Sequence, residues 1–381
     1  MNTSMRSILR QAAGILISAA ATLSAFAEDG VTDKTIRIGQ TVGVTGQIAA
    51  QVKEMIEGAN AYISVVNKRG GVNGRKIEII TLDDKFDPAI AAKNAEKLIM
   101  EEQVFALFQC RGTPHTQAIL PVLVAGQVPL VAPSTGAAIF HEPVNPLLFN
   151  VRARYQDEVA KGVQLFTTVG IRKISLIHVD DSFGKDGLGG FTKAMAAHDL
   201  KPVSIIQFDR VNPDFNAVVG EAIKGSPQAV IIVSSAPTAI TIIRSLREKG
   251  SRMQVMTLSN NASQSFVQNL GPAGAGVIIS QITPAPDLVS SVLGQEFKLA
   301  AAASNATVSY AAMEGFVAAK VLVKGLEQAG RKLTRAGFIR GLESIRKTDL
   351  GGITLSYAPD RHTGSEYVEL TMIGKNGRYV R

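Results

Sequence analysis

The chain has 381 residues and a formal charge of +8, with 40 Lys and Arg against 32 Asp and Glu. The basic residues are scattered, and six Tyr with no Trp offer little for base stacking, so no nucleic-acid partner is expected. A single cysteine, Cys110, excludes an internal disulfide. Five histidines without paired metal-ligand spacing give no sign of a metal site.

The first residues have the features of a secretory signal peptide. Arg6 and Arg10 flank the start of an apolar, alanine-rich segment that ends in Ala25-Phe26-Ala27, an arrangement typical of a cleaved export signal. A membrane anchor is the alternative, but the apolar stretch falls short of the roughly 20 residues that a spanning helix needs. We therefore expect residues 1–27 to be removed and the mature protein, starting near Glu28, to be periplasmic.

The mature chain predicts an α/β fold. It is longer than one hydrophobic core usually serves, so two lobes are expected. Short β-branched runs alternate with longer amphipathic stretches, and several runs, such as Ala229-Val230-Ile231-Ile232-Val233, are apolar throughout. Such runs are typical of parallel strands that helices cover on both faces. We expect these strands at 36–40, 76–82, 104–108, 129–132, 173–179, 203–208, 229–234, 254–258 and 276–282.

The C-terminal part has a different pattern. A long helix is expected at 308–328, followed by strands at 353–357 and 367–373. The last strand leads through Lys375-Asn376-Gly377 into a terminal hairpin. Since strand–helix alternation occurs twice before this region, a ligand cleft is expected where the carboxyl ends of two parallel sheets face each other.

Two strand-to-helix junctions in the first half offer hydrogen-bond donors for an anion. One reads Gly112-Thr113-Pro114, where Thr113 is expected to be the N-cap of a helix with Pro114 at its first position. Free N–H groups, a hydroxyl and a glycine that permits close approach suit a carboxylate; the alternative is that Thr113 only caps the helix. The other junction, Ser134-Thr135-Gly136, offers similar donors.

The second half contributes further candidates and no evident catalytic set. Phe183 is a candidate apolar wall, with core packing as the alternative; Ser235 and Ser259 follow two later strands, and Tyr310 begins the long helix. The chain has no G-x-S-x-G motif and no phosphate-loop lysine, so neither an enzyme nor a cofactor is expected. A triad assembled in space from distant segments is left open.

At these positions the chain resembles the periplasmic leucine/isoleucine/valine-binding family, the type I periplasmic binding proteins of ABC importers. The resemblance covers essentially the whole mature chain. Its motifs, specific by their order and spacing, are Gly43-Val44-Thr45-Gly46, Asn67-Lys68-Arg69-Gly70-Gly71-Val72-Asn73-Gly74-Arg75-Lys76, Asp83-Asp84-Lys85-Phe86-Asp87-Pro88, Gly112-Thr113-Pro114, Val128-Pro129-Leu130-Val131-Ala132-Pro133 and Asp181-Ser182-Phe183-Gly184-Lys185-Asp186-Gly187.

The resemblance implies two Rossmann-like lobes with parallel sheets, joined by three crossovers near residues 152, 281 and 350. One lobe would comprise 28–152 plus 282–350, and the other 153–281 plus 351–381. It further implies closure on a small organic ligand, such as a carboxylate or a branched-chain amino acid, and docking of a monomer to ABC permease subunits. The matching ligand-binding positions are Gly112, Thr113, Ser134, Thr135, Gly136, Tyr155, Phe183, Ser235, Ser259 and Tyr310.

One departure from the family bears on the ligand. Amino-acid binders of this family commonly carry an acid after the strand at 254–258, where it pairs with the ligand ammonium, whereas this chain has Ser259-Asn260. Because a buried ammonium without a counter-charge is costly, we expect a small carboxylate without an amine, either aromatic or aliphatic. Asp180 or Asp181 is the alternative counter-charge that would restore amino-acid binding.

Two other functions remain open at this point. A periplasmic ligand sensor that signals to a receptor would use the same fold with a different partner surface. An exported α/β enzyme would turn its ligand over, but it lacks a recognisable nucleophile or metal motif here.

Overall fold

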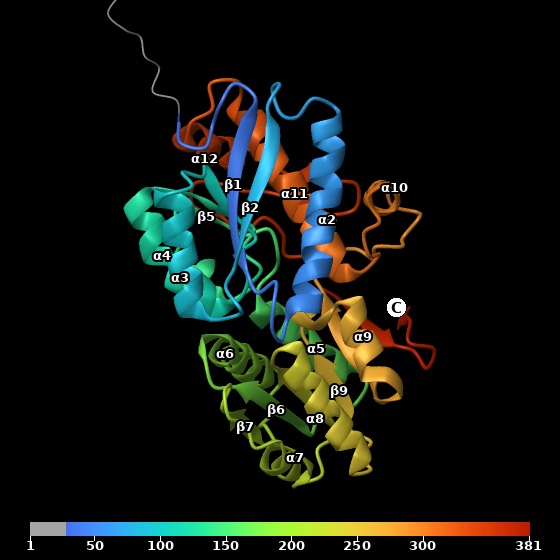
Figure 1. Cartoon of the computed structure of the whole chain (residues 1–381). Helices are drawn as coiled ribbons and strands as arrows, with labels where there is room; N and C mark the ends of the chain where they lie inside the picture. The colour runs from blue at the N-terminus through green and yellow to red at the C-terminus, as the bar shows by residue number, and fades with distance from the viewer. Residues whose placement is uncertain (1–27) are drawn as a thin grey trace, which may run out of the picture.

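Two β-sheets, each flanked by helices, form the two halves of the molecule (Figure 1). The computed structural model describes residues 28–381, so the predicted signal peptide lies outside the described residues. The halves are called the first lobe, built on β1–β5 with α2–α4 and α10–α12, and the second lobe, built on β6–β10 with α5–α9 and the C-terminal hairpin. The predicted α/β fold with two sheet-based lobes is confirmed.

The first lobe contains a parallel sheet in the order β2-β1-β3-β4-β5. Its strands are β1 (Thr35–Val42), β2 (Lys76–Asp83), β3 (Ala106–Phe108), β4 (Leu130–Val131) and β5 (Leu148–Phe149), and its connecting helices are α2 (Ala49–Lys68), α3 (Pro88–Met100) and α4 (Thr113–Gly126). Every residue of β3, β4 and β5 is buried, as expected for strands between helical layers. Helix α3 begins where the Asp87 carboxylate accepts the N–H groups of Ala89 and Ile90.

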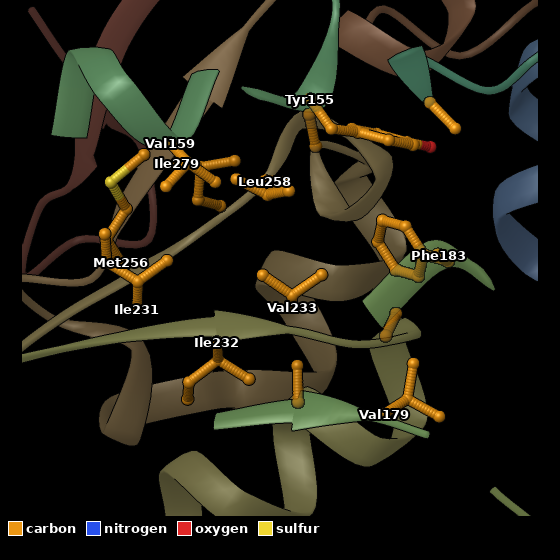
Figure 2. Close-up of a cluster of buried hydrophobic side chains, with 14 of the residues drawn as sticks. Tyr155, Val159, Val179, Phe183, Ile231, Ile232, Val233, Met256, Leu258 and Ile279 are labelled. Carbon is orange, nitrogen blue, oxygen red and sulfur yellow. The ribbon is translucent and has the colours of Figure 1, made fainter. Parts of the chain in front are cut away.

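The second sheet is mixed, with the order β14-β13-β10-β9-β8-β6-β7. Its parallel strands are β6 (Ile174–Val179), β7 (Ile205–Phe208), β8 (Ala229–Val233), β9 (Gln254–Thr257) and β10 (Ile278–Gln281). The predicted C-terminal hairpin, β13 (Glu369–Ile373) and β14 (Tyr379–Val380), joins this sheet antiparallel. The covering helices are α5 (Tyr155–Thr168), α6 (Ser182–Ala197), α7 (Phe215–Ile223), α8 (Ala236–Glu248) and α9 (Gln264–Leu270). Figure 2 shows the apolar side chains of β8 between the side chains of neighbouring elements.

The chain returns to the first lobe after β10. Helices α10 (Val292–Ser304), α11 (Tyr310–Ala329) and α12 (Arg335–Glu343) belong to this return, and α11 lies against α2 (Figure 1). The two helices approach closely because each has a glycine at the crossing: a Cβ on Gly58 would overlap the Ala312 carbonyl, and one on Gly315 would overlap the Met55 carbonyl. Among residues 28–381, no helix has both the length and the apolar character needed to cross a membrane.

The segment expected as a strand at 353–357 behaves differently from the prediction. Only β12 (Thr354–Leu355) is extended, and it pairs with β11 (Thr348–Asp349) instead of the second sheet. Leu355 and Tyr357 pack in the core of the first lobe, and the Tyr357 hydroxyl donates to the Asn150 carbonyl at 3.0 Å. These contacts place the segment with the first lobe, so they favour a third crossover beyond Gly364 over one near residue 350.

Candidate ligand-binding site between the lobes

A small cavity lies between the two lobes. Most of its lining comes from loops at the carboxyl ends of strands β2, β3 and β4 in the first sheet and β6 to β9 in the second, the place where ligands bind in open α/β sheets. Its residues are Ile48, Gln51, Phe86, Arg111, Gly112, Thr113, Pro114, Ser134, Tyr155, Phe183, Arg210, Ser235 and Asn260. Six predicted residues therefore meet here: Gly112, Thr113, Ser134, Tyr155, Phe183 and Ser235.

The start of α4 forms one wall of the cavity. The prediction that Thr113 caps this helix is wrong: Gly112 is the N-cap, with φ 107°, and no side chain caps the first turn. Thr113 is the first helical residue, and its hydroxyl bonds the Thr135 hydroxyl at 2.7 Å. A helix start with N–H groups unclaimed by a side-chain cap favours an anionic group, so the anion-binding interpretation keeps its physical basis.

Arg111, which sequence reasoning missed, is buried in the same wall. Its guanidinium donates to Ser134 Oγ and to the Asn260 carbonyl of the second lobe, both at 3.0 Å. Burial lowers the pKa of Arg111, and the charge of Glu314 partly offsets that effect. An arginine directly before a Gly-Thr-Pro helix start, at the end of a buried strand, is the signal that could have identified it.

Behind Arg111 lies a buried ionic network. Arg152 donates to Glu158 Oε1 at 2.7 Å and to Ser259 Oγ at 2.6 Å, and Glu314 lies 3.5 Å away. Burial by itself lowers the pKa of Arg152, but the surrounding charges, including those of Glu158 and Glu314, raise it overall. Ser259 also donates its N–H and hydroxyl to Glu158. It therefore belongs to this network and does not line the cavity, contrary to its predicted place.

Two aromatic rings provide an apolar wall on the second-lobe side. The rings of Tyr155 and Phe183 lie 4.8 Å apart and are tilted by 54°, at one end of the second lobe's hydrophobic cluster (Figure 2). The Arg152 guanidinium lies over the Tyr155 ring, 4.6 Å from its centre. Asp181 fixes the position of Phe183, because it caps α6 and accepts the Phe183 N–H. Phe183 packs in the core and also lines the cavity, a position compatible with both alternatives.

A three-layer stack joins the two lobes at this cavity. Phe86 of the first lobe stacks on His115, with ring centres 4.4 Å apart, and Arg210 of the second lobe lies over Phe86 at 5.5 Å. Asp181 pairs with Arg210, so it holds that arginine over the ring. Burial lowers the pKa of His115 to about 4, so the imidazole is neutral at neutral pH. Sequence reasoning missed Phe86 and Arg210.

Three other predicted residues lie outside the lining. Thr135 sits behind Thr113, to which it is hydrogen-bonded. Gly136 accepts the Tyr155 N–H at 2.7 Å, and a Cβ there would lie 2.7 Å from the Ala153 carbonyl oxygen, so its role is close packing. Tyr310 packs edge-on against Tyr379 of the C-terminal hairpin, with ring centres 5.1 Å apart. No signal in the sequence linked Tyr310 to that hairpin.

Comparisons with known proteins agree with this architecture. The pattern of the family described as "Periplasmic binding protein" matches residues 35–378. An "Amino acid binding protein" of Pseudomonas aeruginosa is 24% identical over 249 residues, which is 64% of this chain and 65% of that protein. "Leu/Ile/Val-binding protein homolog 3" of Brucella melitensis is 23% identical over 330 residues, 85% of this chain and 87% of that protein.

A solved structure is similar over most of the chain. The substrate-binding periplasmic protein from Ralstonia solanacearum has a TM-score of 0.85 and 29% identity, and the match covers 91% of this chain and 99% of that one. The family consists of ligand-binding proteins. With two sheet-based lobes around a cavity and a family match over residues 35–378, this chain belongs to the periplasmic binding protein family.

Proposed function

We propose that this protein is the extracytoplasmic solute-binding component of an ABC importer. It closes its two lobes on a small molecule and delivers that molecule unchanged to the membrane permease. The observation that carries this proposal is the cavity whose lining comes from both lobes. A ligand there contacts both halves only when they are closed, so its binding energy favours closure.

The proposed ligand is a small carboxylate without an ammonium group. The lining contains two arginines, Arg111 and Arg210, and no aspartate or glutamate. After β9 the cavity meets Asn260, whose Nδ2 donates to the Ser234 carbonyl. Asp181, considered above as a substitute counter-charge, is paired with Arg210. A ligand ammonium would therefore be buried without a carboxylate partner, which is costly.

The remaining parts of the proposal concern export and architecture. We propose that residues 1–27 direct the chain to the periplasm and are removed there, and that the protein acts as a monomer without a cofactor. For the lobe boundaries we propose 28–152 plus 282–364 and 153–281 plus 365–381, with the third boundary moved because Tyr357 packs in the first lobe.

The proposal is tested with protein purified from its own host. Native mass spectrometry should reveal one retained small molecule, and small-angle scattering should show a smaller radius of gyration when that molecule is added back to the ligand-free protein. Recovery of the molecule chemically unchanged supports binding and counts against an enzyme. Scattering profiles that never contract across a broad metabolite panel would contradict the proposal.

A further inference from the structure

The hydroxyl groups expected to hold a ligand carboxylate are mostly engaged within the protein. Ser134 Oγ donates to Glu314 Oε1 at 3.0 Å and accepts from Arg111. Because a serine hydroxyl has one proton, Ser134 has none left for a ligand. The hydroxyls of Thr113 and Thr135 are hydrogen-bonded to each other, so only one of their two protons can point elsewhere. The hydroxyls alone therefore provide a weak anion site.

Arg111 supplies what these hydroxyls lack. It is 7% exposed, and its guanidinium contacts the Ser134 hydroxyl, the Asn260 carbonyl and, at 4.0 Å, the sulfur of Met55. All of these groups are neutral. Within residues 28–381, no carboxylate lies within ion-pairing distance of Arg111. A guanidinium has five N–H donors, and a buried charge without an ionic partner is destabilising.

Arg152 provides an internal comparison. It is 3% exposed, and its guanidinium contacts the carboxylates of both Glu158 and Glu314. Two arginines in neighbouring positions are thus similarly buried, but Arg152 has two carboxylates in direct contact, whereas Arg111 reaches Glu314 only through the Ser134 hydroxyl. The one without a direct carboxylate partner, Arg111, is the one that lines the cavity.

We propose, on the basis of the proposed function, that Arg111 binds the ligand's carboxylate and is the residue that determines specificity for an anion. Glu314 holds it in place through Ser134. The ligand's negative charge neutralises the guanidinium in a charge-assisted hydrogen bond. An α-ammonium beside that carboxylate would face a like charge, so the same residue selects acids over amino acids.

Arg111 also links ligand binding to closure. Its second hydrogen bond reaches the Asn260 carbonyl, which belongs to the second lobe. The guanidinium therefore touches both lobes as well as the cavity. A ligand that orients it also favours the closed arrangement.

The stability of the ligand-free protein tests this assignment without knowledge of the natural ligand. After extensive dialysis, Arg111→Met should raise the midpoint of thermal unfolding, because it replaces an uncompensated buried charge with an apolar chain of similar length. Arg152→Met should lower the midpoint, because it leaves Glu158 and Glu314 buried without their partner. A fall of similar size in both variants would show that Arg111 is structural and would overturn the proposal.

Binding by calorimetry provides the second arm, with paired probes: benzoate and benzamide, and 4-methylpentanoate and leucine, within a wider panel of acids. The wild-type protein should bind an acid and discriminate against its uncharged amide and against the amino acid. Arg111→Met should weaken the binding of that acid about 10- to 100-fold, and Arg111→Lys should weaken it less. Arg252→Met, at an exposed position in the second lobe, is the control and should bind like the wild type.

The outcomes separate this inference from the proposed function. If the wild-type protein contracts on a ligand that Arg111→Met binds equally well, the inference fails and the solute-binding function stands. The inference also fails, with the function intact, if the amide binds as tightly as the acid. If the wild-type protein neither binds nor contracts on anything tested, the proposed function fails, and the thermal comparison of Arg111→Met with Arg152→Met still decides whether Arg111 carries an uncompensated charge.

Discussion

Phe86 has the most unusual backbone among the residues that line the cavity. Its φ is 60°, in the left-handed region that bulky side chains rarely adopt. The conformation is held by Asp84, which accepts the Phe86 N–H at 2.9 Å, and by the stack on His115. Strain of this kind persists where surrounding contacts fix it, often at ligand clamps. Here it presents the ring to Arg210 of the second lobe.

Asp84 gives this loop a pH dependence. Burial is the main cause that raises the pKa of Asp84 from 3.8 to about 6. Because the folded protein holds this proton more tightly than the unfolded chain, the contribution of Asp84 to stability is present at low pH and is lost as the pH rises from about 4 to about 6. Relative to Asp84→Asn, the wild type should therefore gain stability when the pH is lowered from 7 to 5.

Thermal unfolding of both proteins across this pH range measures the effect. The informative quantity is the difference in stability between the wild type and Asp84→Asn. Burial lowers the pKa of His115 to about 4, so His115 destabilises both proteins equally as the pH falls, and its effect cancels in this difference. A difference that is constant with pH would contradict the prediction for Asp84.

The paired threonines allow a second test at the residue scale. Thr113→Ala combined with Thr135→Ala removes a hydroxyl pair bonded at 2.7 Å and with it one donor for the ligand. Affinity should fall by about 1–2 kcal/mol, or roughly 5- to 30-fold, while the protein stays folded. Calorimetry with the retained ligand measures the loss, and circular dichroism controls for folding. Unchanged affinity would show that this hydroxyl pair does not take part in ligand binding.

At the scale of elements, two glycines determine how closely helices pack in the first lobe. Gly58 of α2 and Gly315 of α11 each face the backbone of the other helix. The sequence predicted the long helix at 308–328, but not that it meets α2 at a glycine of each helix. This crossing fixes the position of α11. Because α11 carries Glu314, the crossing also positions the carboxylate that contacts Ser134 and Arg152.

Gly315→Ala should therefore destabilise the first lobe. Its new methyl group would overlap the Met55 carbonyl, and forcing an extra carbon into a close contact costs about 1–3 kcal/mol. Gly220→Ala in α7 is the matched control, because a Cβ there meets nothing within 4 Å. That change should instead stabilise its helix, by up to about 1 kcal/mol. Urea denaturation measures both, and equal effects would refute the packing argument.

At the scale of the whole molecule, direct contacts across the cleft favour the closed arrangement. Glu54 of α2 accepts the N–H groups of Gln264 and Ser265, at the start of α9 in the second lobe, at 2.8 and 2.9 Å. A carboxylate at a helix start is a favourable placement. This Glu54 contact and the packing of Arg210 over Phe86 connect the two lobes without involving the ligand.

Glu54→Ala should shift the equilibrium toward the open form. We expect affinity for the retained ligand to fall about tenfold, and small-angle scattering at intermediate ligand concentration to show a larger radius of gyration than for the wild type. Glu57→Ala is the control, because Glu57 lies on the same helix but accepts the Thr307 N–H within the first lobe. Equal losses in both variants would show that the effect is not closure.

The sequence by itself determined the local parts of this protein. The apolar run of β8 predicted a strand buried on both faces, and every residue of β8 is buried. The motifs with their order predicted the family and the two-lobed fold, and the junction residues Gly112, Thr113, Ser134, Phe183 and Ser235 were found because strand ends can be located from local pattern alone.

Only the tertiary structure decided which polar groups are free to bind. Ser259 follows its strand as predicted, yet it bonds to Glu158, 101 residues away. Ser134 gives its proton to Glu314, 180 residues away, while Arg111 receives no carboxylate. Such pairings depend on long-range packing that no local pattern encodes, because a hydrogen-bond donor is available to a ligand only after every distant segment has taken its place.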